Sequence, residues 1–280
     1  MMQTPLIEGT RFPFRAYPDG WFAVATLAEL PVRRVLFGRP TLIERRAGRI
    51  EATALPHLEV RDGLVFAWHH AGGERPSFRL PPAEIERWSK PVVDTLSVSS
   101  HPQEVLENTV DTQHFVKVHG YRDFEEVAPA RVNGPHFHAS YRFTRALLDH
   151  PASPRVPIEI EIQASGLGYS RVEVTVAPVQ LRARLEVMVT PELGERCTLR
   201  SATRVQAPAL PRSFSFLQWP VERLFDGVAH LAALGGRADV RDDLHLWQHK
   251  IYAARPVLVR DDGPIGLYRR WARQFMAEAA

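Results

Sequence analysis

Hydrophobic and polar residues alternate with a period of two over several long stretches of this chain. The longest of these stretches lie between residues 130 and 206, and glycine-containing turns separate several of them: residues 130–144, 157–165, 169–177, 181–190 and 196–206. Because successive side chains of a strand point to opposite faces, these stretches predict an antiparallel sheet of five or six strands.

The helical pattern, with a period of three to four, occurs in three places. One helix is expected from His101-Pro102 to about residue 118, and a short one over residues 265–276. Between them, an apolar stripe that includes Phe225 predicts a long helix, interrupted at Gly235-Gly236. A long C-terminal helix wrapped by an antiparallel sheet is an α+β, helix-grip arrangement, like that of START and Bet v1 proteins, and usually encloses a cavity.

The first ninety residues have a different character. Short β-like segments alternate with turns there, and residues 58–68 predict a hairpin with Asp62-Gly63 at its tip. We therefore expect two parts, a small all-β unit over residues 1–90 and the sheet-and-helix domain over residues 91–280. The aromatic cluster Phe214, Phe216 and Trp219 is expected to belong to the core of the second part.

Composition narrows the class of protein. The chain has 280 residues, 45% of them hydrophobic and 24% charged, which is typical of a globular protein. The net charge is only +3 and no basic block occurs, so nucleic-acid binding is not expected. Residues 1–10 do not resemble a secretory signal, and no apolar run is long enough to span a bilayer. A cytoplasmic protein is expected.

The segment ENTVDTQHFVKVHG, residues 107–120, is the most informative for chemistry. On a helix, Asn108, Asp111 and His114 share one face, and a bulge or a distorted last turn would bring His119 to His114. Two neutral imidazoles and one carboxylate can hold Fe(II) and leave positions open for O₂ and substrate. Taken alone, an H-x₄-H pair also fits two ordinary core or surface histidines.

The string Asp111-x-x-His114-x-x-x-x-His119 resembles the iron-binding motif of Rieske non-haem iron oxygenase α subunits, in the branch of 3-ketosteroid 9α-hydroxylase and cholesterol 7-desaturase. Asp243, four residues before Trp247, resembles that branch's aspartate ligand. The resemblance implies that His114, His119 and Asp243 bind a mononuclear Fe²⁺, with Asp242 as an alternative. It also implies that Asp111 links the iron to the cluster of a neighbouring subunit.

The chain departs from this family in one respect. A Rieske [2Fe–2S] cluster needs two cysteines and two histidines, whereas Cys197 is the only cysteine here. We therefore expect no cluster in these residues. The first part of the chain then resembles a remnant of the Rieske scaffold. Electrons are expected from a cluster-containing partner subunit or a ferredoxin, in a trimer or hetero-oligomer.

Two hypotheses for function remain open. The first is an oxygenase-type catalytic subunit that acts on an apolar, sterol- or steroid-like molecule. The second is a non-catalytic subunit that binds such a ligand or packs beside a complete oxygenase. In either case His136 and His138, which share one face of a strand, could contact substrate or be solvated, and Phe225 could line the cavity.

Overall fold

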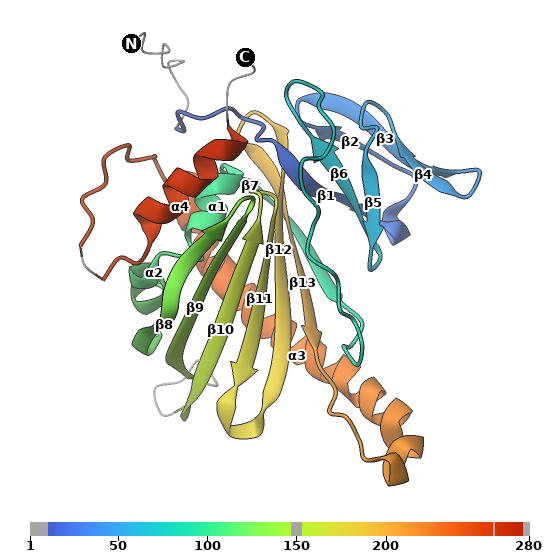
Figure 1. Cartoon of the computed structure of the whole chain (residues 1–280), viewed down its shortest axis with the longest axis vertical. Helices are drawn as coiled ribbons and strands as arrows, with labels where there is room; N and C mark the ends of the chain where they lie inside the picture. Colours follow the sequence, from blue (N-terminus) through green and yellow to red (C-terminus); the bar gives the residue numbers. More distant parts are fainter. Residues whose placement is uncertain (1–10, 147–152, 260, 277–280) are drawn as a thin grey trace.

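The computed structural model describes residues 11–146, 153–259 and 261–276, and residues 1–10 lie outside this description. A seven-stranded antiparallel sheet is the largest element, in the order β7-β13-β12-β11-β10-β9-β8. The long helix α3 crosses one face of this sheet, and a smaller β unit lies beside it (Figure 1). The seven strands are β7 (Val92–Ser99), β8 (Arg122–Asn133), β9 (His136–Ala146), β10 (Arg155–Ser165), β11 (Tyr169–Val176), β12 (Leu181–Leu193) and β13 (Arg196–Val205).

The antiparallel sheet expected from the alternating pattern is confirmed, with one error in its strand count. Residues 130–144 are not one strand. Gly134, with a φ of 53°, and Pro135 turn the chain between β8 and β9. The alternation continues through this turn because the two strands pair with each other and present their apolar residues to the same core.

The N-terminal unit consists of two three-stranded sheets. The hairpin with Asp62-Gly63 at its tip is confirmed, since these two residues join β5 to β6. One sheet has the order β1-β6-β5 and the other β2-β3-β4. The strands are β1 (Gly20–Thr26), β2 (Val32–Leu36), β3 (Arg39–Arg46), β4 (Arg49–Ala52), β5 (Leu58–Arg61) and β6 (Leu64–His69). The division at residue 90 remains a prediction.

The single helix expected over residues 101–118 is wrong. The chain forms two short helices, α1 (Pro102–Glu107) and α2 (Thr112–Lys117), with a break between them. Asp111 caps the second helix, because its Oδ1 accepts the backbone N–H of His114 at 3.0 Å. A Cβ on Gly263 would collide with the Val110 carbonyl oxygen, so the C-terminal segment packs tightly against this break.

The interruption expected at Gly235-Gly236 is also wrong, because α3 (Gln218–His249) continues through both glycines. Two glycines cost a helix roughly 1 kcal/mol each relative to alanine. Packing of α3 across β13 and β7 offsets that cost, and the missing side chain of Gly236 leaves open space beside the sheet. The C-terminal helix α4 (Ile265–Ala272) then covers α1.

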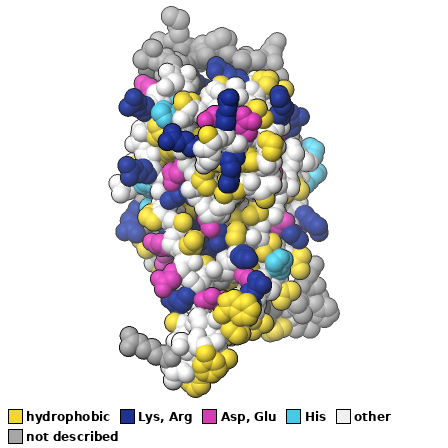
Figure 2. Space-filling view, turned by 90° about the vertical axis from the view of Figure 1, so that its right-hand side faces the viewer, with side chains coloured by type: hydrophobic (Ala, Val, Ile, Leu, Met, Phe, Trp, Pro, Cys, Tyr) yellow, Lys and Arg dark blue, Asp and Glu magenta, His cyan; other side chains and the backbone are white. Residues whose placement is uncertain are grey.

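The aromatic cluster expected in the core is exposed instead. Phe214, Phe216 and Trp219 are 51%, 73% and 67% exposed. They lie where the start of α3 projects beyond the sheet, and Figure 2 shows apolar side chains gathered at that end. The sequence pattern was misleading because an apolar stripe does not reveal where a helix leaves its sheet. Within the described ranges, every helix is too short or too polar to cross a lipid bilayer.

His101 couples the N-terminal segment to α1 and gives the fold a pH dependence. Its Nδ1 accepts the Gln103 backbone N–H at 3.1 Å, and its Nε2 lies 2.9 Å from the Arg15 carbonyl oxygen. The imidazole is therefore neutral with its proton on Nε2. Burial lowers the pKa of His101 to about 4.

Because the unfolded chain takes up this proton near pH 6.5 and the folded chain does not, stability is present above pH 6.5 and is lost as the pH falls toward 4. The loss should reach about 3 kcal/mol, measured by urea unfolding at several pH values. His101→Asn keeps a helix cap but cannot titrate, so its stability should fall less over this range. Parallel pH profiles for the two proteins would refute the assignment.

Candidate metal centre

Three side chains from two distant parts of the chain meet beside α3. His114 Nε2 lies 2.8 Å from Asp243 Oδ1, and His119 Nε2 lies 3.5 Å from the same oxygen. One ligand atom from each residue lies within 4.8 Å of the other two. The structure therefore brings together the three residues that the sequence singled out, while Asp242 on the same helix is exposed.

These ligand atoms are buried but do not satisfy one another. The side chains of His114, His119 and Asp243 are 6%, 4% and 11% exposed. Within the described part of the chain, His114 Nε2 and Asp243 Oδ1 have no hydrogen-bond partner despite their proximity. Buried carboxylate oxygens and imidazole nitrogens without hydrogen-bond partners are costly unless they share a cation. The donor set fits a divalent metal with a preference for nitrogen and oxygen ligands.

The break between α1 and α2 sets the direction of both imidazoles. Asp111 begins α2 and thereby fixes the backbone of His114, and α2 ends just before His119. The change of direction that brings the two rings together is thus a helix end rather than a π-bulge. The contact that Asp111 makes here is with the His114 backbone and not with its ring.

An ion-pair cluster holds the end of α3 that carries Asp243. Lys250 Nζ lies 3.1 Å from a carboxylate oxygen of Glu104 and 3.4 Å from one of Glu107. Arg269 of α4 donates two hydrogen bonds to Glu107, at 2.7 and 2.8 Å. Because Glu104 is fully buried, removing Lys250 would leave the Glu104 carboxylate without the cation that pairs with it. The cluster ties α1, α3 and α4 together.

A second carboxylate, which the sequence analysis missed, lies one turn before Asp243. Asp239 Oδ1 is 3.9 Å from His119 Nδ1, and Asp239 also accepts a bidentate pair from Arg145 at 2.8 and 2.9 Å. Burial lowers the pKa of His119, and Asp243 and Asp239 oppose that shift. The i, i−4 spacing from Asp243 on one helix face was the signal available in the sequence.

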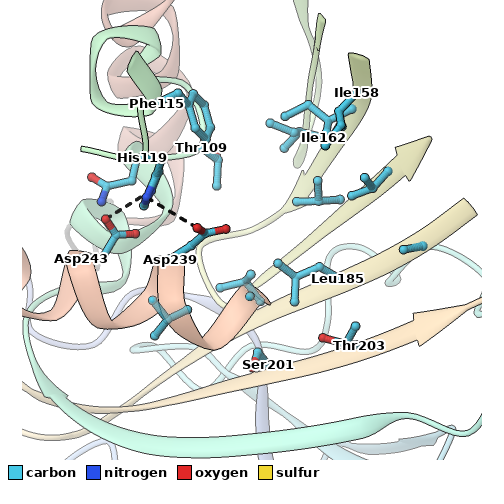
Figure 3. A pocket seen from close by; sticks show the side chains of 18 of the residues that line it. Thr109, Phe115, His119, Ile158, Ile162, Leu185, Ser201, Thr203, Asp239 and Asp243 are labelled. Carbon is cyan, nitrogen blue, oxygen red and sulfur yellow. Dashed lines mark ion pairs between the residues drawn. The ribbon is translucent and has the colours of Figure 1, made fainter. Parts of the chain in front are cut away.

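His114, His119 and Asp243 line an apolar cavity of about 320 Å³. Figure 3 shows His119 and Asp243 at one end of this cavity, between α3 and the sheet. Asn108 also lines this cavity, as expected, and its buried Nδ2 has no hydrogen-bond partner within the described residues. Most of the wall consists of aliphatic side chains from β10, β11 and β12, including Ile158, Ile160, Ile162, Val172, Val174 and Leu185.

Three candidate substrate contacts lie away from this cavity. His136 and His138 are on the face of β9 opposite to Phe137, which is buried in the core. Phe225 lies on the part of α3 that precedes the cavity, whose lining on that helix begins at Ala232. The strand period placed the two histidines on one face correctly, but it does not reveal which face is concave.

The fold and the site together define a domain of the oxygenase type. Residues 67–276 match the family model of the 3-ketosteroid 9α-hydroxylase C-terminal domain. The chain belongs to this family, in the Rieske non-haem iron oxygenase group, and its residues lack the cluster motif.

Two curated proteins of this family are similar in sequence to this chain. The oxygenase component of 3-ketosteroid-9-alpha-monooxygenase from Rhodococcus rhodochrous is 25% identical over 254 residues, which are 84% of this chain and 62% of that protein. Cholesterol 7-desaturase nvd 2 from Ciona intestinalis is 24% identical over 247 residues, 78% of this chain and 50% of that protein. The chain thus spans less than two thirds of either relative.

Solved structures share the fold. Dicamba monooxygenase bound to dicamba superimposes with a TM-score of 0.63 at 14% identity, over 94% of this chain and 98% of that chain. A structure of the same enzyme with non-heme iron gives a TM-score of 0.57 at 13% identity, over 92% and 97% of the two chains.

Metal analysis tests the ligand set. After anaerobic loading and gel filtration, the protein should retain up to one Fe(II) per chain. His114→Ala, His119→Ala and Asp243→Ala should each lose it, because two remaining ligands hold Fe(II) poorly. Asp242→Ala is the matched control and should keep its iron. Equal losses in Asp242→Ala and Asp243→Ala would show that the aspartate is assigned wrongly.

The position of Asp239 generates a separate prediction. Asp239→Asn removes the charge beside His119 and leaves Arg145 unpaired, so iron affinity should fall about 10- to 100-fold. Asp242→Asn makes the same charge change on an exposed part of α3 and should have little effect. Competition with a chelator measures both affinities, and melting temperatures establish whether the variants are folded. Equal affinities in the two variants would contradict a positioning role.

Proposed function

We propose that this chain is the catalytic subunit of an oxygenase, and that His114, His119 and Asp243 hold a mononuclear Fe(II). The observation that carries the proposal is the convergence of the buried side chains of His114, His119 and Asp243 at one end of an apolar cavity, where His114 Nε2 and Asp243 Oδ1 have no hydrogen-bond partner within the described residues. Bound iron would supply O₂ activation. The reaction could yield a hydroxylated, desaturated or demethylated product.

The chain's own residues prepare this site in three ways. Burial favours the neutral form of His119, which leaves its nitrogen lone pair free for a metal. Asp239 lies beside the other nitrogen of that ring and is itself held by Arg145. The aliphatic wall suits a rigid apolar substrate, for which the steroid and cholesterol relatives suggest a sterol- or steroid-like molecule.

We further propose that electrons arrive from a different chain, either a Rieske-cluster-containing subunit or a ferredoxin, in a trimer or hetero-oligomer. Cys197 is the only cysteine of these residues, so they cannot hold a cluster that needs two. Asp111 is half-buried and lies between α1 and α2, next to a proposed ligand. It is the candidate link to that partner.

The helix-grip assignment belongs to the same proposal, since a sheet folded against a long helix encloses the cavity. That cavity also suits a second candidate function, a subunit that binds an apolar ligand without chemistry. The two functions differ in their need for stoichiometric iron and for a redox partner.

Reconstitution distinguishes them. The protein alone with reductase and O₂ should be inactive and should gain turnover of a steroid when a cluster-containing relative is added. Asp111→Asn should abolish this gain and keep the iron, because asparagine still caps α2 but carries no charge. Asp111→Ala, which also loses the cap, should reduce iron content as well.

Two outcomes would contradict the proposed partner or the proposed enzyme. If the isolated protein turns over fully with a small-molecule reductant, and Asp111→Asn does not change the rate, no partner is needed. If no relative restores turnover although iron is bound, the chain is a binding subunit rather than an enzyme.

A further inference from the structure

Two hydroxyl groups lie among the mostly aliphatic side chains that β12 and β13 present to the cavity. On β13, Ser201 and Thr203 line the cavity together with Leu199. Their cross-strand neighbours on β12 are Val187 and Leu185, which also line it. A strand face that packs only against core would carry aliphatic residues at these positions, so the two hydroxyls require another explanation.

These hydroxyls lie far along the cavity from the proposed metal ligands. Figure 3 shows Ser201 and Thr203 across the cavity from His119. Ser201 pairs with Asp94 of β7, and Asp94 forms an ion pair with Arg237 of α3, six residues before Asp243. Six helical residues span about 9 Å. Thr203 lies two residues beyond Ser201 along β13, which places it about 6 Å further along the strand than Ser201.

Neither hydroxyl has a hydrogen-bond partner among the residues that the structure describes. Other threonines of the sheet use theirs internally, as Thr190 does by donating to the Ala23 carbonyl oxygen at 2.8 Å. No side-chain hydrogen bond links Ser201 or Thr203 to any part of the chain that the structure describes. Each therefore has an unused donor and acceptor that face the cavity.

The charges around the cavity exclude an anionic group at this end. Its two lining arginines are both engaged, Arg145 by Asp239 and Arg184 by Glu173 at 2.6 Å. A ligand carboxylate beside Ser201 and Thr203 would be desolvated without a free cation to pair with it. A ketone or a hydroxyl needs only the hydrogen bonds that these side chains offer.

We propose that Ser201 and Thr203 are specificity-determining residues that anchor a single uncharged oxygen at the far end of an elongated apolar ligand. The opposite end of the ligand then lies at the proposed metal ligands, so the anchor fixes which carbon approaches them. This inference rests on the proposed use of the cavity as a substrate site, but it concerns binding rather than turnover.

The test compares the binding of matched steroids to the iron-loaded full chain under nitrogen, by calorimetry. The probes are 5α-androstane, 5α-androstan-3-one and an androstane carboxylic acid. The ketone should bind about tenfold more tightly than the hydrocarbon, since neutral hydrogen bonds add this much. The carboxylate should bind most weakly.

Ser201→Ala combined with Thr203→Val should bring the ketone to within about twofold of the hydrocarbon, with hydrocarbon affinity unchanged. Thr203→Ser should keep the preference. Ser97→Ala combined with Thr95→Val removes the same two hydroxyls from exposed positions on β7 and is the matched control.

A preference that survives in the Ser201/Thr203 double variant would overturn the inference. So would a carboxylate that binds as well as the ketone, or a failure of all three probes to bind. Iron content is measured on the same samples. Anchored binding by a chain that gains no turnover when O₂, reductase and a cluster-containing relative are added would retain the inference and refute the proposed enzyme. Turnover in that reconstituted mixture without anchored binding would do the reverse.

Discussion

The rest of the structure depends on one electrostatic constraint, which is that the largely buried Asp243 carboxylate faces two buried imidazoles. The oxygen of Asp243 approaches the ring nitrogens of His114 and His119 closely and yet forms no hydrogen bond with them. Such an arrangement is stable only if a cation shares the three lone-pair directions or if the groups are held apart by rigid neighbours. The fold provides rigid neighbours, and the two imidazole nitrogens and one carboxylate oxygen are atoms that favour a metal ion.

Much of the surrounding architecture serves that constraint. The break between α1 and α2 aims two histidines at one point, and the close approach of Gly263 to Val110 braces the break. The cluster of Lys250 with Glu104 and Glu107 fixes the end of α3. Asp239, which is also on α3, lies beside the His119 ring. His114, His119, Asp239 and Asp243 line one end of the cavity, so the proposed metal ligands are part of the proposed substrate site.

The sequence predicted the sheet, the long helix and the three convergent residues, because period-two alternation and spaced ligand motifs are local signals. It failed where the outcome depends on tertiary packing. Gly235 and Gly236 suggested an interruption, but α3 continues because the sheet supports it. His136 and His138 share a face as expected, yet only the curvature of the whole sheet determines that this face points away from the cavity.

The position of the Ser201 and Thr203 hydroxyls in the cavity could not be predicted from the sequence, for a related reason. In the sequence they are two ordinary polar residues of a strand, and their significance depends on the apolar neighbours that β12 places opposite them. The exposed aromatic cluster at the start of α3 shows the reverse effect, since an apolar pattern there does not correspond to burial.

The most direct test of the account is an anomalous difference map at the iron absorption edge, from crystals of the protein loaded with Fe(II). The account predicts one strong peak per chain, bonded to His114, His119 and Asp243. A peak at the exposed pair His245 and His249, whose ring centroids are 4.5 Å apart, with none at the buried set, would contradict it.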